Sequence, residues 1–366
     1  MIDIEISASK NYHVLMDRGL LSAAGAYVKK AASPISDEAA GKRKICVITD
    51  ENVAGLYGKD SQPFIRSLSD AGFCVFRYVF PGGESSKTMD TVSSILDFLA
   101  DSGFTRSDLI AALGGGITGD VAGFAAAAFL RGVEYVQIPT SLLATVDSSV
   151  GGKTGVNLNA GKNLAGAFWQ PSLVLFDPDV LETLSQPLRL DGIAETLKAG
   201  IIGDPSIIED AEGVCHPDDP QLLTELAARA VKVKKRIVEE DEREKGSRQL
   251  LNLGHTPAHA IERLSGYTVS HGHAVAIGMC IMSKAAARLG MLKKDDAHRI
   301  TAVLENAGFS LSCPFSAKEL AEAALSDKKR RGRMITLVIP RAIGECSLMT
   351  VDVSELETVI SLGLSA

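Results

Sequence analysis

The chain has 366 residues, of which 46% are hydrophobic, so it is long enough for two domains of ordinary size and can bury substantial cores. This composition excludes wholesale disorder. The 45 acidic residues outnumber the 38 basic ones, and the net charge of −7 argues against a nucleic-acid partner, which would need a basic surface.

Three features of the sequence predict the cellular compartment of the protein: its N-terminus, its apolar stretches and its cysteines. MIDIEISASK carries acidic residues and lacks the apolar core of a signal peptide. The longest apolar stretch, Leu109–Leu130, is interrupted by Asp120 and five glycines, which is typical of a buried core rather than a membrane span. Six cysteines occur without a Cys-x-x-Cys pair, which favours free thiols in a reducing compartment. We therefore expect a cytoplasmic protein with no membrane partner.

The first half of the chain alternates strand-like and helix-like segments. Short apolar runs predict strands at Ile45–Thr49, Cys74–Phe80, Leu109–Leu113, Tyr135–Ile138 and Leu173–Phe176. Several of these runs lack polar alternation, which is typical of strands buried on both faces of a parallel sheet. Apolar residues at helical spacing between two of them predict an amphipathic helix around Val92–Leu99. We expect an α/β domain over residues 1–179, built on a Rossmann-like, doubly wound parallel sheet.

After Pro178 the pattern becomes mainly helical. A long apolar stripe predicts a helix that begins near Pro220. Further helices are expected at Leu188–Ile202, Thr256–Leu264, Ala274–Leu289 and Ala297–Ala307. Only Met334–Ile339 and Cys346–Val351 resemble strands, and the turn at Ile343–Gly344 predicts a late hairpin. We therefore expect a second, mainly α-helical domain over residues 180–366.

Four of the seven histidines lie between positions 255 and 273. His255 and His259 are separated by four residues, which places them about 40° apart around a helix and about 6 Å along it. His271 follows a short loop, just before another predicted helix. The best carboxylate candidate is Glu195, with Lys198 at i+3. Two imidazoles and a carboxylate form a common divalent-metal site, but histidines at this spacing also occur as helix caps and surface residues.

Three glycine-rich stretches could approach a phosphate. GGGITGD, from Gly114 to Asp120, lies between a predicted strand and a helix, where backbone N–H groups can bind a pyrophosphate. The same run could equally be a structural turn. PGGESSK, from Pro81 to Lys87, precedes the amphipathic helix. The third stretch, 139–163, mixes apolar residues with Asp147, Lys153, Lys162 and Asn163, which indicates a partly buried polar site.

Basic residues of the helical half have two interpretations. As isolated side chains they would be solvated surface charges. If they converge, they would suit a small polyanion such as a phosphorylated sugar acid. The residues concerned are Lys198, Lys234, Arg248, Lys328 and Lys329.

Taken together, the motifs resemble those of the 3-dehydroquinate synthase family, within the sugar-phosphate cyclase superfamily. The resemblance covers residues 44–344 and is specific, because eight motifs follow one another in the family's order. They are PGGESSK, GGG-xx-GD-xx-GF, RG-xxxx-QIPT, VDSSVGGKTGVN, GKNLAGAF-x-QP, GIAE-xx-K-x-G, DERE-x-G-x-R-xx-LN-x-GHT and HG-x-AV.

The resemblance implies a phosphate-eliminating carbon–oxygen lyase of the shikimate pathway, which leads to chorismate and the aromatic amino acids. Such an enzyme converts 3-deoxy-D-arabino-heptulosonate 7-phosphate to 3-dehydroquinate and phosphate. The family oxidises a ring alcohol transiently with bound NAD, eliminates phosphate, returns the hydride, and then opens the ring and recloses it by an intramolecular aldol step. Its cofactors are NAD and Zn²⁺ or Co²⁺, and a homodimer is implied.

The resemblance also implies roles for individual residues. Glu195, His255 and His271 match the family's metal ligands, and His259 matches a histidine that assists proton transfer. Residues matching the phosphate side are Lys153, Asn163, Lys198 and one of Lys328 or Lys329. Residues matching the polar shell around the ring hydroxyls and carboxylate are Asp147, Lys234, Glu244, Arg248 and Asn252. Arg131 matches an arginine that reaches across a dimer interface.

For NAD, the matching positions extend along the first domain. They are Asp50, Asn52, Glu84, Lys87, Gly115, Gly116, Asp120, Thr140, Ser141, Asp147, Lys153, Lys162 and Thr183. The chain departs from the family pattern at Pro257 and Ala258, where Phe-Gly is usual, at His273, where Glu is usual, and at Ser141, where Thr is usual. Because Pro257 and His273 adjoin the metal ligands, these departures bear on metal affinity, and His273 is a competing ligand candidate.

Three other functions remain as alternatives. The first is another sugar-phosphate cyclase, of the 2-epi-5-epi-valiolone or 2-deoxy-scyllo-inosose synthase type. The second is an iron- or glycerol-dehydrogenase-like oxidoreductase, which would release NADH. The third is a catalytically silent NAD-binding protein. The presence together of four residues favours the dehydroquinate-forming enzyme; they are Lys234, Arg248, Asn252 and His259.

Overall fold

The structure is a computed structural model that describes residues 1–34, 42–212, 219–325 and 333–365. It divides into two compact units, Met1–Leu184 and Ser185–Ala366. The predicted boundary at residues 179 and 180 falls inside the short 3-10 helix Pro178–Thr183, just before this division. Among the described residues, no helix is both long enough and apolar enough to cross a membrane.

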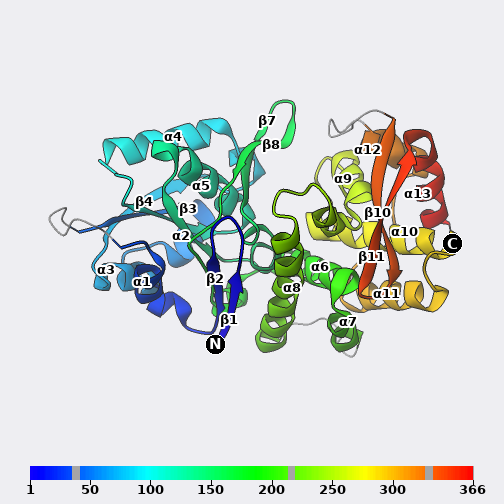
Figure 1. Ribbon diagram of the computed structural model, residues 1–366, viewed down its shortest axis with the longest axis horizontal. Coiled ribbons are helices and arrows are strands. Elements are labelled where there is room, and N and C mark those ends of the chain that lie inside the picture. Colours follow the sequence, from blue (N-terminus) through cyan, green and yellow to red (C-terminus); the bar gives the residue numbers. More distant parts are fainter. Residues whose placement is uncertain (35–41, 213–218, 326–332, 366) are drawn as a thin grey trace. The chain divides into compact units, whose positions relative to one another are not determined.

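A seven-stranded sheet organises the first unit (Figure 1), in the order β1-β2-β9-β6-β5-β3-β4. Its strands are β1 (Ile2–Ile6), β2 (Tyr12–Met16), β3 (Lys44–Asp50), β4 (Cys74–Phe80), β5 (Leu109–Gly114), β6 (Glu134–Pro139) and β9 (Leu173–Phe176). Only the β1–β2 pair is antiparallel, and the other neighbouring pairs are parallel. The five predicted strands are confirmed, and all of them pair in parallel within this sheet. The antiparallel hairpin β1–β2 was not predicted.

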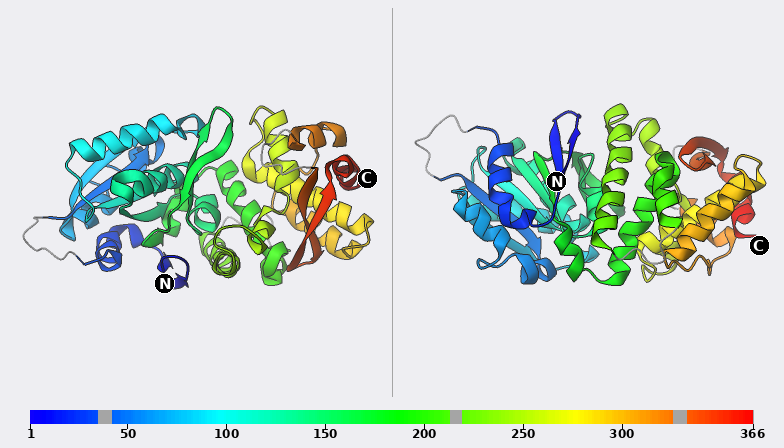
Figure 2. Two further views of the ribbon diagram at one scale, coloured as in Figure 1. Left: turned by 45° about the horizontal axis from the view of Figure 1, so that its top comes forward. Right: turned by 90° about the horizontal axis from the view of Figure 1, so that it is seen from below.

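Helices cover both faces of the sheet, which confirms the doubly wound class. Helices α1 (Leu20–Ala31) and α3 (Pro63–Asp70) pack in one apolar core, and α4 (Met89–Asp101) and α5 (Gly116–Ala128) pack in another. The blue α1 and the cyan α4 lie on opposite sides of the sheet in Figure 2. Strand β5 is buried along its whole length because both cores cover it. The short helix α2 (Glu51–Tyr57) follows β3 directly.

A glycine brings α5 close to its neighbours. A Cβ added at Gly123 would lie 2.5 Å from Cγ2 of Thr154 and 3.2 Å from the Tyr135 ring. No side chain fits in that space, so only glycine allows this approach. Thr154 belongs to β7 (Lys153–Leu158), which pairs with β8 (Gly161–Phe168) in a separate antiparallel hairpin. This hairpin was not predicted, although it contains several predicted site residues.

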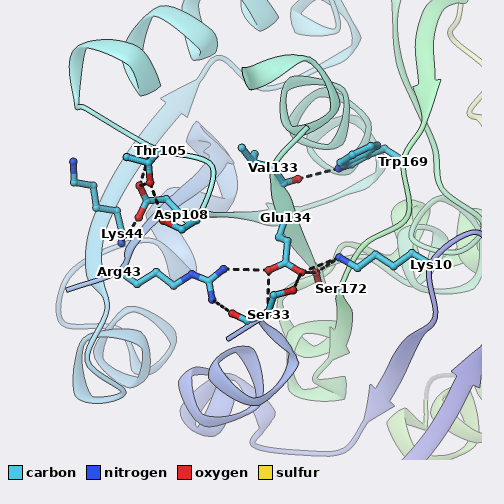
Figure 3. Close-up of polar contacts among 11 residues, drawn as sticks. Lys10, Ser33, Arg43, Lys44, Thr105, Asp108, Val133, Glu134, Trp169 and Ser172 are labelled. Carbon is cyan, nitrogen blue, oxygen red and sulfur yellow. Dashed lines mark hydrogen bonds and ion pairs between the residues drawn. The ribbon is translucent and has the colours of Figure 1, made fainter. Parts of the chain in front are cut away.

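A polar network surrounds Glu134, the first residue of β6 (Figure 3). The Glu134 carboxylate accepts hydrogen bonds from Lys10, from Arg43 and from the backbone N–H and hydroxyl of Ser33. Burial by itself would raise the pKa of Glu134, but the hydrogen bond from the Ser33 backbone and the Lys10 ammonium outweigh burial and lower that pKa to about 2. None of these residues is a predicted site residue, so we assign the network to stability.

The second unit is mainly helical, as predicted. Its helices are α6 (Gln186–Gly203), α7 (Pro205–Glu212), α8 (Pro220–Glu240), α9 (His255–Leu264), α10 (His271–Arg288), α11 (Lys294–Asn306), α12 (Ala317–Leu325) and α13 (Leu356–Leu364). The late hairpin is confirmed as β10 (Met334–Ala342) and β11 (Glu345–Asp352). Helix α10 begins at His271, before the predicted Ala274, because the Asp191 carboxylate accepts the Gly272 N–H at 2.9 Å and fixes the first turn.

Candidate functional site

Three side chains of the second unit meet in a group in which Glu195 is buried and the two histidines are half-buried. Glu195 lies in the middle of α6, His255 is the first residue of α9, and His271 is the first residue of α10. Glu195 Oε1 lies 3.7 Å from His255 Nε2 and 3.3 Å from His271 Nε2. One ligand atom from each residue lies within 4.8 Å of the others. Across the described ranges, this is the only trio of His, Cys, Asp or Glu residues whose donor atoms gather so closely.

These donors suit a divalent cation in both chemistry and spacing. Imidazole nitrogen and carboxylate oxygen both bind zinc at about 2.0–2.2 Å, and two ligand atoms of such a tetrahedron lie about 3.3 Å apart. The two measured separations from Glu195 Oε1 come close to that value. Three protein ligands are also the usual set in catalytic sites, because a fourth position stays available to substrate or water.

Each ligand has an outer partner that orients it. His255 Nδ1 lies 3.2 Å from the Leu253 carbonyl oxygen, which can only accept, so Nδ1 carries the proton and Nε2 keeps its lone pair. His271 Nδ1 lies 3.6 Å from Glu262 Oε1 on α9. The Lys198 ammonium contacts the second oxygen of Glu195, so Oε1 alone faces the imidazoles. Such partners fix ligand orientation in metal sites.

The pKa values of the two histidines are shifted in opposite directions. Burial and the Lys198 ammonium hold the pKa of His255 well below its usual value. His255 therefore presents the neutral imidazole that metals bind. Burial opposes a charge on His271 as well, but the carboxylates of Glu195 and Glu262 outweigh burial and raise its pKa to about 10.

The other predicted residues of the second unit differ in their contacts. The His259 ring contacts the His255 ring edge-on, with centroids 5.4 Å apart. Asn252 Nδ2 donates to Glu244 Oε1 at 3.1 Å. Arg248 is only 1% exposed and its guanidinium donates to the Glu242 carbonyl. Lys234, on α8, is also buried. Lys328 and Lys329 lie outside the described residues.

The departures from the family pattern fit the local structure. Pro257 stands in the first turn of α9, where its missing N–H breaks no helical hydrogen bond. Ala258 is fully buried and donates its N–H to Gly254. The His273 ring packs edge-on against Phe309 with centroids 5.1 Å apart, and His273 is outside the trio of close donors. The structure therefore does not make His273 a competing ligand.

In the first unit, the glycine turn after β5 is suited to an anion. Gly115 precedes α5, and the start of that helix has no side-chain cap. Gly115 has an ordinary backbone conformation, and a Cβ there would meet nothing closer than Ser141 Oγ at 3.8 Å. Neither backbone strain nor crowding therefore explains this glycine, whereas the close approach of a pyrophosphate to the helix N-terminus would.

Lys87 and Asp120 form a buried ion pair beside this turn. Lys87 Nζ lies 2.5 Å from Asp120 Oδ2. Burial raises the pKa of Asp120 to about 6 despite Lys87, and the nearby carboxylates of Asp147 and Glu84 act in the same direction. The structure thus brings four predicted residues, Glu84, Lys87, Asp120 and Asp147, within electrostatic reach of one another.

Asp50 and Asn52 lie at the end of β3, next to the PGGESSK loop. Asp50 caps α2 by accepting the backbone N–H groups of Asn52 and Val53, and it also accepts the Thr118 hydroxyl at 3.2 Å. A Cβ added at Gly82 would lie 2.4 Å from Asn52 Nδ2, so the loop passes directly over Asn52. Both oxygens of Asp50 therefore already have partners within the protein.

The remaining predicted residues of the first unit are more dispersed. The Thr140 N–H donates to the Gly114 carbonyl, and Ser141 Oγ accepts the Ala144 N–H. Thr183 shares a hydrogen bond with the Tyr57 hydroxyl at 2.8 Å. Lys153 and Lys162 are on the β7–β8 hairpin, Lys162 near its tip. Exposed Arg131 follows α5 and is not among these groups.

Three of the predicted site residues have strained backbones. Among described non-glycine residues, five have positive φ, and these include Arg131 (69°), Asn163 (53°) and Glu244 (56°). Such conformations are uncommon outside glycine and cluster at functional sites. The other two residues with positive φ, Leu130 and Tyr267, are not predicted site residues.

Sequence reasoning missed three residues that organise the site. Glu262 approaches His271, Asp191 fixes the first turn of α10, and Asn157 donates to Glu84 at 2.7 Å. Glu262 left a signal, because it lies seven residues after His255 and therefore on the same helix face. Asp191 and Asn157 gave no such signal, since their partners are far away in sequence.

Comparisons with known proteins agree with one another. A model of the 3-dehydroquinate synthase N-terminal domain matches residues 77–189, and a model of its C-terminal domain matches residues 192–330. The chain is 41% identical to the 3-dehydroquinate synthase of Streptococcus suis (strain 05ZYH33), over 94% of this chain and 95% of that one. It is 42% identical to the 3-dehydroquinate synthase of Geobacter metallireducens, over 97% of each.

Solved structures of similar fold contain cofactors. A 2-deoxy-scyllo-inosose synthase complexed with carbaglucose-6-phosphate, NAD⁺ and Co²⁺ superposes with a TM-score of 0.86 at 25% identity, covering 98% of this chain and 99% of that one. A 2-epi-5-epi-valiolone synthase from Streptomyces hygroscopicus, with NAD⁺ and Zn²⁺ bound, gives 0.82 at 27% identity, with coverages of 97% and 98%. A glycerol dehydrogenase from Schizosaccharomyces pombe gives only 0.64 at 14% identity, covering 96% and 88%, which shows the fold alone.

Proposed function

This chain belongs to the 3-dehydroquinate synthase family, and from that membership we propose how its residues divide the reaction. The enzyme is a lyase that converts 3-deoxy-D-arabino-heptulosonate 7-phosphate to 3-dehydroquinate and phosphate. It uses NAD and a divalent metal, Zn²⁺ or Co²⁺. The observation that carries the residue assignment is the close approach of the donor atoms of Glu195, His255 and His271.

Glu195, His255 and His271 would hold the metal. When bound there, a divalent cation acts as a Lewis acid that polarises substrate hydroxyls. The chain's own part is to keep the ligands in place: Lys198 occupies one oxygen of Glu195, and the Leu253 carbonyl fixes the His255 tautomer. His259, whose ring lies beside His255, would move a proton at the same site.

The glycine turn and the residues beside it would hold NAD. When bound, NAD takes a hydride from a ring carbon and later returns it, so the reaction has no net redox change. Gly115 and Gly116 offer backbone N–H groups to the pyrophosphate. Glu84 and Asp120 offer carboxylate oxygens, which are suitable acceptors for ribose hydroxyls. The rest of the proposed NAD set is Asp50, Asn52, Lys87, Thr140, Ser141, Asp147, Lys153, Lys162 and Thr183.

Buried cations and amides would orient the phosphorylated sugar acid. Arg248 offers a planar guanidinium, which suits the substrate carboxylate. Lys234, Glu244 and Asn252 complete the polar shell around the ring, and Lys153, Asn163 and Lys198 would contact the phosphate. Arg248, Lys198 and Lys234 are all buried, which supports this assignment, because electrostatic contacts with an anion are stronger in a site that excludes water.

We also propose that the enzyme works in the cytoplasm as a homodimer in which Arg131 completes the partner's site. The free thiols of all five described cysteines support a reducing compartment. The exposed, left-handed backbone at Arg131 supports a constrained role for that side chain. Mixing inactive Arg131→Ala and Glu195→Gln proteins should then restore activity, because one mixed site contains both native residues. No recovery after subunit exchange would contradict the dimer assignment.

The direct test is phosphate release from the heptulosonate 7-phosphate, measured with and without a metal chelator. We expect one phosphate per dehydroquinate, no accumulation of free NADH, and loss of turnover with chelator. Sedoheptulose 7-phosphate serves as the parallel substrate. Turnover of that substrate alone would instead indicate a cyclase of the valiolone type, and a steady rise of NADH would indicate a dehydrogenase.

A further inference from the structure

Asn157 connects two parts of the first unit that the proposed function assigns to different ligands. Its Nδ2 donates to Glu84 Oε1 at 2.7 Å, and its Oδ1 accepts the backbone N–H of Asn163 at 2.9 Å. Glu84 belongs to the proposed NAD set, and Asn163 to the proposed phosphate set. Asn157 itself has no role in either set.

The two partners determine how the Asn157 amide is oriented. An ionised carboxylate can only accept a hydrogen bond, and a backbone N–H can only donate one. Nδ2 must therefore face Glu84 and Oδ1 must face Asn163. A rotated amide would lose both bonds, so a residue that only accepts or only donates cannot satisfy both partners.

The backbone of Asn157 is also tied to the Glu84 loop. The β7–β8 register shifts between Val156 and Leu158, which leaves Asn157 as a bulged residue. Its N–H donates instead to the Lys87 carbonyl at 2.9 Å, and it forms a parallel bridge with Thr88. A β-bulge redirects a side chain, and here the bulge directs the amide between the loop and the opposite strand.

At the other end of the connection, Asn163 has a left-handed backbone with φ 53°. Such a conformation persists when surrounding contacts determine it. The bond from the Asn163 N–H to Asn157 is a contact of this kind, because it holds the peptide group between Lys162 and Asn163 in place.

We propose that Asn157 is a positioning residue that holds Glu84 for the dinucleotide and Asn163 for the substrate phosphate. The inference rests on the proposed function, since it takes the two ligands from there. The two bonds come from opposite ends of one amide. Changing one end therefore separates the contribution of Asn157 to NAD binding from its contribution to phosphate binding.

Asn157→Asp changes only the Glu84 end. The new carboxylate still accepts from Asn163 but repels Glu84, so the Kd for NADH should rise at least about tenfold while KM for the heptulosonate stays within about twofold. Asn157→Ala removes both bonds, so NADH Kd and KM should each rise about three- to tenfold. NADH fluorescence gives the Kd without turnover. Asn159→Asp, with the same charge change two residues further along the hairpin, is the matched control and should leave both values within about twofold.

Glu84→Gln provides a readout that general destabilisation would not produce. In the native background it replaces the charged acceptor of the Asn157 amide with a weaker neutral one, so NADH should bind more weakly. In the Asn157→Asp background the Gln amide can donate to the new carboxylate, so NADH should bind more tightly. The sign of the Glu84→Gln effect therefore reverses, while melting temperatures stay within about 2 °C of each background.

Two outcomes would overturn the inference: NADH affinity in Asn157→Asp equal to that in Asn159→Asp, or a Glu84→Gln effect of the same sign in both backgrounds. If Asn157→Asp does not fold, Asn157→Ala decides, and unchanged Kd and KM would overturn it. Failure of the proposed function is distinguishable, because then the unsubstituted enzyme itself would not bind NADH or release phosphate.

Discussion

Each unit of the molecule contains a largely buried pair of a lysine and a carboxylate, and the surroundings of the two pairs differ. In the first unit, the Lys87 and Asp120 side chains are 8% and 19% exposed, and the other nearby charges are the carboxylates of Asp147 and Glu84. In the second unit, Lys198 and Glu195 are 5% and 2% exposed, and the nearby groups are the imidazoles of His255 and His271.

The difference indicates what each pair can bind. Excess carboxylates around Lys87 provide acceptors for the hydroxyl groups of a nucleotide, whereas imidazoles around Glu195 provide lone pairs for a metal. Under the proposed function, the same residue combination would therefore serve nucleotide recognition in the first unit and metal coordination in the second. The first unit adds backbone N–H groups at a glycine turn, while the second relies on charged side chains enclosed by helices.

The largest expected effect is that of Glu195→Gln. Gln keeps the shape but loses the charge that holds both the metal and Lys198, so metal affinity should fall at least about 100-fold and phosphate release should be abolished. Glu262→Gln, which changes an outer partner only, is the control and should lose about 10- to 100-fold in affinity. Competition with a chelator measures both. Full metal content together with full activity in Glu195→Gln would contradict the assignment of Glu195 as a metal ligand.

A smaller effect is expected for Lys87→Met in the first unit. Removing the ammonium leaves Asp120 buried among other carboxylates, so its pKa should rise further and NADH affinity should fall about tenfold. Metal content should stay unchanged, because the metal ligands are all in the second unit. Fluorescence titration and metal analysis of the same sample separate the two effects. Equal loss of metal and NADH would contradict the division of roles.

The smallest effect on function is expected for Glu134→Gln, which belongs to neither pair. The pKa of Glu134 is lowered to about 2, so its ionised form stabilises the fold above its ordinary pKa of 4.5, and this contribution is lost as pH falls toward 2. The variant should be less stable by about 1–2 kcal/mol at pH 7 and should approach the unsubstituted protein near pH 2.

Thermal unfolding across that pH range checks the Glu134 prediction. NADH and metal affinities measured at pH 7 serve as the functional controls and should be unchanged. A stability difference that grows as the pH falls would contradict the assigned sign of the pKa shift.

The sheet of the first unit was predictable because its strands are continuous apolar runs. Cys74–Phe80 and Leu173–Phe176 were predicted with the ends that the structure shows. The β7–β8 hairpin was not, because polar and glycine residues interrupt its pattern and its pairing depends on a bulge at Asn157. Local periodicity carries no information about such a bulge.

The candidate site was predictable in its residue types more than in its geometry. The spacing of His255 and His259 placed them on one helix face, and Glu195 and His271 were candidates before the resemblance selected Glu195, His255 and His271 as the ligand set. That His271 begins α10 follows from the contact of Asp191 with Gly272, which joins residues far apart in the chain. The left-handed backbone at Arg131 could not be predicted from the sequence either, because an arginine has no local preference for it.

The most direct test of the account is to crystallise the protein with Co²⁺ and locate the ion by its anomalous scattering. We predict one strong peak bonded to Glu195 Oε1 and to Nε2 of both His255 and His271, with Lys198 still against the second carboxylate oxygen. A peak on other residues, or those three side chains without an ion at saturating Co²⁺, would contradict it.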